Sequence, residues 1–252
     1  MGPQRYVTRG LVLRETDTRD ADKILTVLTA DRGKLSVIAR GARRKGSRVA
    51  AACQLLAYSE LTLYEKGQWM MLDEANTLEL FGGLRQDLEA LSLAAYFAEL
   101  TEAVSEGCGG EALPLLLNAL YALSQLHKPT RLVKPTFQLR LMALAGYEPL
   151  AQGCARCGAP EPEKPMLDVL HGVVHCAACR EKGGLSLPLD AAALAALRYA
   201  LYAPAKRLYS FTLPPASLAA LDHAADAFVS AQLERSFRTL DYYKSILPQE
   251  DI

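Results

Sequence analysis

Apolar and polar residues alternate over short stretches in the first 80 residues, which is the pattern of half-buried β-strands. In Ser59–Tyr64, Leu61 and Leu63 fall on one face while Glu60 and Thr62 fall on the other. Turn-forming residues separate five such stretches: Gly10–Glu15, Ile24–Thr29, Leu35–Ala39, Ser59–Tyr64 and Trp69–Leu72. Five short strands predict a small barrel or sandwich, and a five-stranded, partly open barrel of the OB type fits this count.

After Phe81 the apolar residues change to helical spacing. Glycines and prolines divide this part into five expected helices: Leu84–Ser105, Leu113–Leu126, Thr130–Ala145, Ala191–Leu201 and Ser217–Leu233. The expected fold is therefore an α+β multidomain chain. Residues 1–80 are expected to form an OB-fold β-barrel, a fold that commonly binds nucleic acid, and residues 81–252 a helical domain. Residues 150–185, which are rich in cysteine and proline, are expected as an insertion into that domain.

Four cysteines in this insertion form two CxxC pairs separated by 18 residues: Cys154, Cys157, Cys176 and Cys179. This spacing is typical of a structural zinc site, in which each tight turn directs two thiolates at one ion. Two redox-active CxxC pairs are the rival interpretation, but they usually occur in a βαβ context that is absent from this sequence. Four cysteine ligands would leave no open position on the metal, so we expect zinc to be structural and not catalytic.

The remaining cysteines and the nearby histidines are expected to have no role in chemistry. We interpret Cys53 and Cys108 as core or surface thiols, and His171 and His175 as ordinary exposed residues. His175 adjoins Cys176 and could replace a cysteine ligand, but four cysteines already complete the shell.

The formal net charge is zero, with 28 Lys+Arg and 28 Asp+Glu, but the charges are unevenly distributed. No acidic residue occurs between Asp31 and Glu60, a stretch that contains seven basic residues: Arg32, Lys34, Arg40, Arg43, Arg44, Lys45 and Arg48. A solvated loop is the simplest interpretation of a charge run. However, a solvated surface usually mixes charges of both signs, so the one-sided run favours an anionic partner such as nucleic acid.

Motifs of common enzymes are incomplete or absent. Gly41–Arg48 has the first half of a phosphate-binding loop but lacks the Lys-Ser/Thr that contacts the terminal phosphates and magnesium. The four histidines have no recognisable catalytic spacing, so we expect a protein that is not an enzyme.

No apolar run reaches the ~18 residues of a membrane helix, and Met1–Arg5 leads into no signal-peptide core. We therefore expect a cytoplasmic protein with no membrane partner.

Three segments of the chain resemble the RecO family of bacterial DNA repair proteins. They are Phe137–Leu150 followed by Cys154–Gly158, the basic segment Lys34–Arg44, and the stretch Leu61–Glu74. The resemblance implies a recombination mediator of the RecF pathway that is associated with the nucleoid. Such a protein binds single- and double-stranded DNA and anneals complementary strands. Together with RecR it helps to load RecA onto DNA covered by single-strand-binding protein, and its zinc is structural.

Residue roles follow from these patterns. We predict DNA contacts at the seven basic residues named above. Tyr58 and Tyr64 could stack on bases or fill the barrel, and Trp69 is expected in the core. Arg131, Lys134 and Arg140 share helical spacing and could receive an acidic partner tail, unless they are ordinary surface charges.

The competing hypothesis is a zinc-ribbon subunit that contacts other proteins within a nucleic-acid-processing complex and needs no basic barrel loop.

Overall fold

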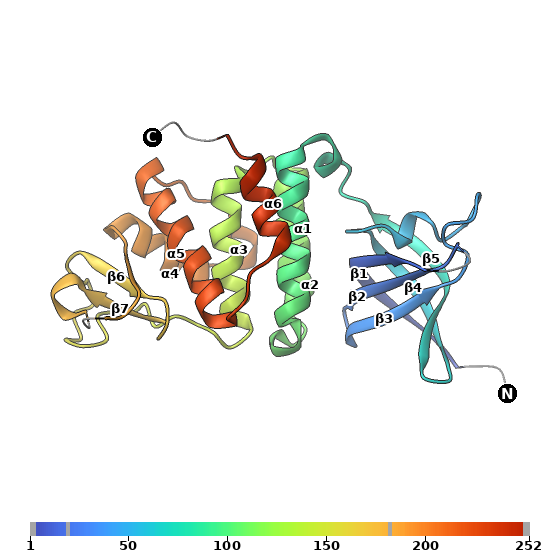
Figure 1. The fold of residues 1–252 in the computed structure, drawn as a ribbon, viewed down its shortest axis with the longest axis horizontal. Coiled ribbons are helices and arrows are strands. Elements are labelled where there is room, and N and C mark those ends of the chain that lie inside the picture. The colour runs from blue at the N-terminus through green and yellow to red at the C-terminus, as the bar shows by residue number, and fades with distance from the viewer. Residues whose placement is uncertain (1–3, 19–20, 181–182, 249–252) are drawn as a thin grey trace. The chain divides into compact units, whose positions relative to one another are not determined.

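The computed structural model describes residues 4–18, 21–180 and 183–248, drawn in Figure 1. These residues form two compact units. The first comprises the chain as far as Gln125 together with the segment from Phe237, and the second runs from Leu126 to Ser236. The first unit is therefore assembled from segments that are far apart in the sequence.

The N-terminal part of the first unit is a closed five-stranded barrel (Figure 1). Its strands are β1 (Arg5–Asp17), β2 (Lys23–Thr29), β3 (Gly33–Ala39), β4 (Tyr58–Lys66) and β5 (Trp69–Glu79). The order around the barrel is β1-β2-β3-β5-β4, and every pairing is antiparallel except that of β3 with β5. The prediction of a five-stranded OB-type barrel is confirmed, and the five predicted segments all lie within these strands.

The barrel core is aliphatic and follows the alternation seen in the sequence. Leu61 and Leu63 of β4 are buried, whereas the alternate residues Glu60 and Thr62 remain partly exposed. The two leucines pack in one cluster with buried residues of the other strands: Val12, Leu25, Val27, Val37, Ala39 and Leu72. Since each fully buried Leu or Val contributes roughly 1.5–3 kcal/mol, this cluster supplies much of the free energy that stabilises the barrel.

Strand β1 bends sharply so that the barrel can close. Residues 5–11 of β1 pair with β4, residues 10–17 pair with β2, and the register with β2 shifts between Val12 and Arg14. At Gly10, where the two pairings overlap, a Cβ atom would lie only 2.6 Å from Val27 Cγ1. A larger residue would force the buried Val27 side chain or the β1 backbone to shift, so glycine allows the close approach of β1 to β2.

The position of β5 between β3 and β4 determines the length of the connection that precedes β4. A hairpin cannot join β3 to β4, because β5 lies between them. The chain instead crosses the end of the barrel through residues 40–57, which include the short 3-10 helix η2 (Ala51–Cys53). We call residues 40–57 the β3–β4 loop.

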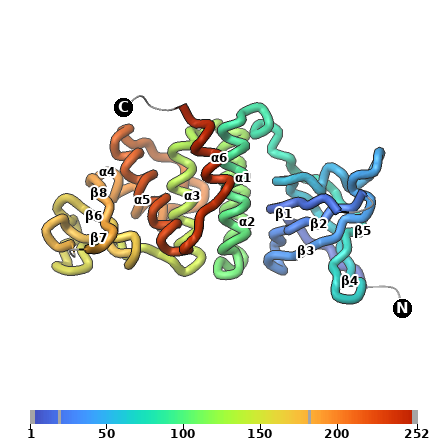
Figure 2. The backbone as a smooth tube through the Cα atoms, viewed as in Figure 1, coloured from blue at the N-terminus to red at the C-terminus, as the bar shows by residue number. Residues whose placement is uncertain are grey.

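Helices complete the first unit: η3 (Gly82–Gln86), α1 (Leu88–Val104), η4 (Ser105–Cys108), α2 (Ala112–Ser124) and α6 (Arg238–Ile246). Helix α1 begins four residues later than predicted, because Asp87 Oδ1 accepts hydrogen bonds from the N–H groups of Glu89 and Ala90 and so caps the helix. The sequence analysis did not identify α6, which packs along α1 (Figure 2).

The second unit contains α3 (Thr130–Leu144), α4 (Ala191–Tyr202), η6 (Ala205–Arg207) and α5 (Pro215–Leu233). Between α3 and α4 lies a small sheet of β6 (Pro165–Asp168), β7 (Val173–Cys176) and β8 (Ser186–Pro188), in the order β7-β6-β8, with η5 (Ala177–Cys179) after β7. This sheet was not predicted. Within the part of the chain that the structure describes, no helix is both long and apolar enough to cross a membrane.

A buried ion-pair cluster joins α3 to α5. Only 2% of Lys134 is exposed, and its Nζ lies 2.9 Å from Asp222 Oδ1 and 2.7 Å from Asp226 Oδ1. Gln138, one turn further along α3, donates to the same oxygen of Asp226 at 2.8 Å. The ammonium group therefore balances two carboxylates at the packed interface of these helices.

We predict that Lys134→Met destabilises the second unit by about 3 kcal/mol, because it leaves two inward-facing carboxylates without their cation. Urea unfolding of the full chain measures this loss. Lys206→Met is the matched control, since Lys206 is exposed on η6, and it should leave the unfolding midpoint unchanged. Adding Asp222→Asn and Asp226→Asn to Lys134→Met should recover part of the loss, and equal effects of the Lys134 and Lys206 variants would contradict the prediction.

Candidate nucleic-acid interface and metal centre

The β3–β4 loop is a series of tight turns anchored in the barrel. Ala42 and Cys53 are buried in the barrel core, and the N–H of Gly41 donates to Asp22 Oδ1 at 2.6 Å. Gly41 and Gly46 have φ angles of +62° and +77°, which glycine adopts without strain. The loop therefore has fixed attachment points, and its exposed residues lie around and between them.

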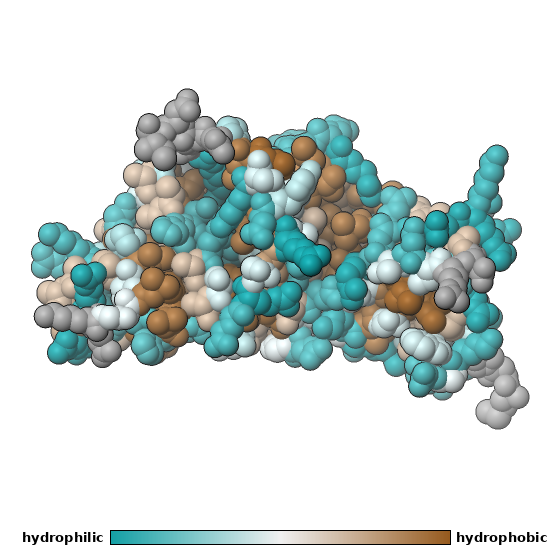
Figure 3. Space-filling view, viewed as in Figure 1, coloured by the Kyte–Doolittle hydropathy of each residue, from teal (hydrophilic) through white to brown (hydrophobic). Residues whose placement is uncertain are grey.

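The projecting residues are cationic. Five of the seven predicted DNA contacts are exposed on this loop: Arg40, Arg43, Arg44, Lys45 and Arg48. Arg43 forms an ion pair with Asp17 at 3.2 Å. Among the described residues, no carboxylate lies within 4.0 Å of the other four cationic groups. A hydrophilic column protrudes in Figure 3 where Figure 2 draws the β3–β4 loop in light blue. The loop thus presents positive charge that the described protein leaves largely unbalanced.

The other two predicted DNA contacts, Arg32 and Lys34, lie at the opposite end of β3, about 20–26 Å from Arg40 at ~3.3 Å per residue. The Arg32 guanidinium lies 3.8 Å from the centre of the Tyr6 ring. Lys34 Nζ pairs with Glu106 at 3.2 Å and is half-buried. The structure therefore brings together five of the seven basic residues, whereas Arg32 contacts Tyr6 of β1 and Lys34 pairs with Glu106 of η4.

Trp69 lies at the surface, so the expectation that it fills the core was wrong. Half of its side chain is exposed (50%). It is the first residue of β5 and pairs with Lys66 beside the Gly67-Gln68 turn, beyond the end of the packed core. Aliphatic residues fill the barrel instead, which leaves the indole ring open to a ligand.

The four cysteines of the CxxC pairs converge on one point, although they come from two separate turns. Their Sγ atoms all lie within 4.8 Å of one another, and Cys157 Sγ is 3.8 Å from Cys176 Sγ. Cys154 and Cys157 flank a turn that ends at Gly158, whose φ is +75°, while the other two cysteines end β7 and η5. Four soft donors this close together could hold one metal ion.

Backbone hydrogen bonds give the first cysteine thiolate character. Burial opposes a charge on Cys154, but N–H groups of Cys157, Cys176 and Arg156 donate to its sulfur, so its pKa falls to about 5. The pKa of Cys179 rises to about 12, because its thiol is hydrogen-bonded to Cys157, is partly desolvated and lies near the Cys154 charge. Without a cation the cluster thus supports one thiolate far more readily than four.

Arg198 of α4 holds the loop that carries the first CxxC pair. Its guanidinium donates to the carbonyl oxygens of Ala151 at 2.7 Å, Gln152 at 3.3 Å and Pro160 at 2.6 Å, and it pairs with Glu161 at 2.8 Å. These residues bracket the turn on both sides, so one side chain fixes both of its ends. The sequence analysis gave Arg198 no role, because its partners are main-chain atoms that leave no pattern in the sequence.

The two histidines near the metal centre differ in exposure. His171 is exposed as expected, and its Nδ1 lies 2.9 Å from Asp168 Oδ2. His175 is buried, so the expectation of an exposed residue was wrong. Strand β7 is covered on both faces at its C-terminal end, because Val174, His175 and Cys176 are all buried.

The two cysteines outside the cluster are buried thiols. Of the two alternatives expected from the sequence, core or surface, the structure shows the first. Burial raises the pKa of Cys53 and of Cys108 to about 11. Both side chains therefore remain protonated at neutral pH and act as small apolar groups.

The three basic residues of α3 that were predicted to bind a partner do not form one exposed surface. Arg131 is exposed, but Lys134 is enclosed by Asp222 and Asp226. Arg140 donates to the main-chain oxygens of Leu201 and Ala203 at the end of α4, and burial lowers its pKa. A partner site on α3 stays a prediction, and the geometry commits Lys134 and Arg140 to internal contacts.

Known proteins match the chain over nearly its whole length. Residues 1–81 match the family described as "Recombination protein O N terminal", and residues 85–241 match "Recombination protein O C terminal". The chain is 30% identical to the DNA repair protein RecO of Acetivibrio thermocellus, over 95% of this chain and 96% of that protein. It is 34% identical to the DNA repair protein RecO of Desulforudis audaxviator, over 96% and 98%. The chain therefore belongs to the RecO family of DNA repair proteins.

Proposed function

We propose that this RecO-family protein is a DNA-binding recombination mediator of the RecF pathway. It would bind single- and double-stranded DNA, anneal complementary strands and, together with RecR, assist RecA loading onto DNA covered by single-strand-binding protein. The observation that carries DNA binding is the β3–β4 loop, whose five exposed cations have only one carboxylate partner among the described residues. The roles of RecR, RecA and single-strand-binding protein are proposed from family membership alone.

The loop suits annealing because two DNA strands repel each other through their phosphates. Cations that neutralise phosphates reduce this repulsion and release bound counterions, which favours the approach of a second strand. Exposed arginine and lysine side chains on a turn can contact phosphates without reading base edges, so binding should have little sequence preference. Trp69, on the same barrel, offers a ring on which an unpaired base could stack.

We further propose that the four-cysteine cluster binds a structural zinc ion. A tetrahedral shell with Zn–S bonds of about 2.3 Å places its sulfur atoms about 3.8 Å apart. The Cys157–Cys176 separation of 3.8 Å agrees with that value. Bound zinc would supply the positive charge that allows all four sulfurs to be thiolates, and Cys154, Cys157, Cys176 and Cys179 would hold it. Four protein ligands would leave no open position for catalysis by the metal, and the motifs of common enzymes are incomplete, so we also propose that the protein has no enzymatic activity of its own.

A zinc-ribbon interaction subunit remains the alternative. In that case the surface of the cysteine module would contact another protein, and the basic β3–β4 loop would be dispensable for DNA binding. Charge reversal on the loop therefore distinguishes the two functions.

We predict that reversing Arg40, Arg43, Arg44 and Arg48 to Glu abolishes DNA annealing while the protein remains folded. If about four loop cations contact phosphates, the logarithm of the single-strand affinity should fall with the logarithm of salt with a slope of about −3, at ~0.7 per contact. Fluorescence anisotropy titrations at several salt concentrations measure the slope, and a strand-annealing assay without ATP or magnesium measures activity. Loss of affinity should be similar for unrelated DNA sequences.

A smaller pair of variants controls for overall charge. Arg44→Glu with Lys45→Glu reverses two adjacent exposed cations on the loop, and Lys206→Glu with Arg207→Glu does the same on η6. Both change the net charge equally, but only the loop variant should weaken DNA binding and flatten its salt dependence. If the two variants bind DNA equally well, phosphate contacts do not lie on the loop and the proposed interface is wrong.

We predict one tightly bound zinc per chain. Such sites carry roughly 10 kcal/mol of binding free energy that is also local folding energy. Cys154→Ser with Cys157→Ser should release the metal and loosen residues 150–185, while the barrel stays folded because it shares no ligand with the site. Metal analysis of protein purified without chelators, combined with amide hydrogen exchange, tests both parts, and well under one zinc equivalent in the parent protein would refute the site.

We also predict that Arg198→Met weakens zinc binding by about tenfold, the lower end of the range for residues that orient ligands. All four ligands remain in this variant, but the turn that presents Cys154 and Cys157 loses its link to α4. Competition with a chromogenic chelator measures the affinity. Arg207→Met, which removes an exposed arginine from η6, serves as the control and should retain the parent affinity.

A further inference from the structure

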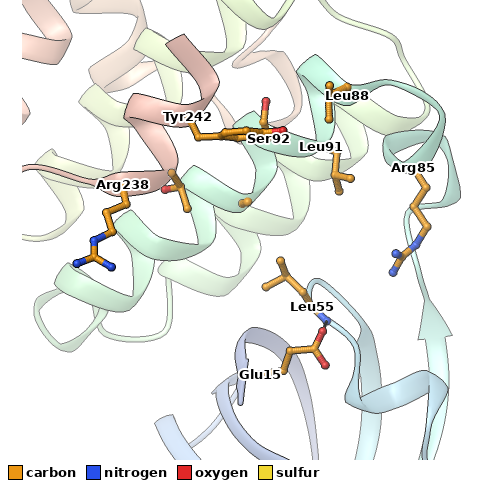
Figure 4. Close-up of a pocket in the computed structure, with 10 residues that line it drawn as sticks. Glu15, Leu55, Arg85, Leu88, Leu91, Ser92, Arg238 and Tyr242 are labelled. Atoms are coloured by element: carbon orange, nitrogen blue, oxygen red, sulfur yellow. Dashed lines mark hydrogen bonds between the residues drawn. The ribbon is translucent and has the colours of Figure 1, made fainter. Parts of the chain in front are cut away.

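A cavity of about 520 Å³ in the first unit has no role in the functions described above. It opens between the end of the β3–β4 loop and helices α1 and α6, as Figure 4 shows. Its walls are mainly apolar, with Leu55 from the loop, Leu88, Leu91 and Ala95 from α1, and Tyr242 from α6. The volume lies within the range of about 300–1,000 Å³ that is typical of ligand pockets.

The polar groups inside the cavity already have partners. The Glu15 carboxylate pairs with the Lys23 ammonium and accepts a hydrogen bond from the N–H of Leu55 at 3.3 Å. The hydroxyl of Ser92 donates to the main-chain oxygen of Glu89 at 2.9 Å. The interior therefore offers a ligand apolar contact and little unsatisfied polarity, and the charge of Glu15 is balanced.

The rim of the cavity combines exposed apolar side chains with two cations. Leu88 is 58% exposed and Tyr242 is 53% exposed, so two large apolar side chains that line the same cavity are open to solvent. Arg85 and Arg238 also line it, and Figure 4 shows them on opposite sides of the apolar residues. A ligand that fits this arrangement has a flat or apolar centre and a negative charge on each side.

Arg85 also connects the cavity to the cationic loop. Its Nη2 donates to Gln54 Oε1 at 2.9 Å, and Gln54 and Leu55 belong to the last residues of the β3–β4 loop. A DNA strand bound along this loop would thus be led toward the mouth of the cavity.

We propose that this cavity binds one unpaired nucleobase of a single DNA strand. The base would stack on Tyr242 and contact Leu55 and Leu91, while Arg85 and Arg238 would contact the phosphates on its two sides. This inference rests on the proposed DNA-binding function and deepens it, because it adds a site that distinguishes single-stranded from double-stranded DNA. A base in a duplex is held in its stack and cannot enter the cavity.

The chemistry of the cavity favours a nucleotide over an acidic peptide. A nucleotide within a strand carries a phosphate on each side of its base, which matches a guanidinium at each end of the cavity. A nucleobase has apolar faces and confines its polar atoms to its edge, which can point toward water. A peptide would bring main-chain N–H and C=O groups against walls whose polar atoms are already paired, and burying them without partners is unfavourable.

Tyr242→Ala in the full-length protein tests the proposal. Its affinity for a fluorescent oligothymidine should fall by about fivefold to a hundredfold, the range expected from loss of one base–aromatic stack. Its affinity for a duplex of equal length should not change, and Tyr242→Phe should restore oligothymidine binding because it keeps the ring. Tyr121→Ala is the matched control, since Tyr121 is equally exposed (50%) on α2 but does not line the cavity.

Photocrosslinking gives a second, independent measurement. An oligonucleotide that contains 5-iodouracil should crosslink to Tyr242 of the parent protein on irradiation, and mass spectrometry should identify the modified peptide. Crosslinks that map only to Trp69 or to other parts of the barrel would overturn the proposal.

The affinity measurements separate failure of this inference from failure of the proposed function. If the parent protein binds neither oligothymidine nor duplex, DNA binding itself is refuted. If the parent binds both but Tyr242→Ala binds oligothymidine as well as the Tyr121→Ala control does, the base pocket is refuted and the loop interface stands. The pocket is also refuted if Tyr242→Ala abolishes binding of an acidic aromatic peptide and leaves oligothymidine binding intact.

Discussion

The parallel pairing of β3 with β5 is the constraint on which the proposed DNA interface depends. It involves only Val37 with Met70 and Ile38 with Met71, yet it closes the barrel and places β5 between β3 and β4. The chain must then cross the barrel end in the β3–β4 loop, since a tight hairpin cannot span an intervening strand. Ala42 and Cys53 anchor that crossing in the core, and the exposed positions between them carry four of the five loop cations. Barrel closure thus creates the surface that the proposed function uses.

Positive charges in this protein have two distinct physical settings. Lys134 and Arg198 contact carboxylates or main-chain oxygens of their own unit, where they hold α3 to α5 and the cysteine turn to α4. Arg44 and Lys45 protrude from the barrel with no carboxylate partner among the described residues. The first group is fixed and desolvated, so it stabilises the fold. The second is hydrated and bears surplus charge, so it can exchange its counterions for phosphates.

The cysteine module illustrates how a segment with few apolar residues can still be ordered. Its sheet has three strands of only three or four residues, and segments below about 40 residues usually need a metal or other cross-links to stay folded. Leu167, Val169 and Val174 are buried, but these aliphatic side chains form only a small apolar core. The Arg198 contacts fix the first turn, and four converging sulfurs would add the binding free energy of a metal. The module therefore depends on polar and metal contacts for what a larger core would otherwise provide.

The sequence by itself determined the five barrel strands, five of the six α-helices described, the cationic run and the cysteine spacing. These features depend on local periodicity, turn residues and short-range order, as the buried Leu61 and Leu63 illustrate. Tertiary structure decided which side chains remain available: it buried Lys134, paired Lys34 with Glu106 and exposed Trp69. It also brought α6 to α1 and so formed the cavity beside Tyr242. Those outcomes depend on contacts between residues far apart in the chain, and a pattern within one segment does not record its distant partners.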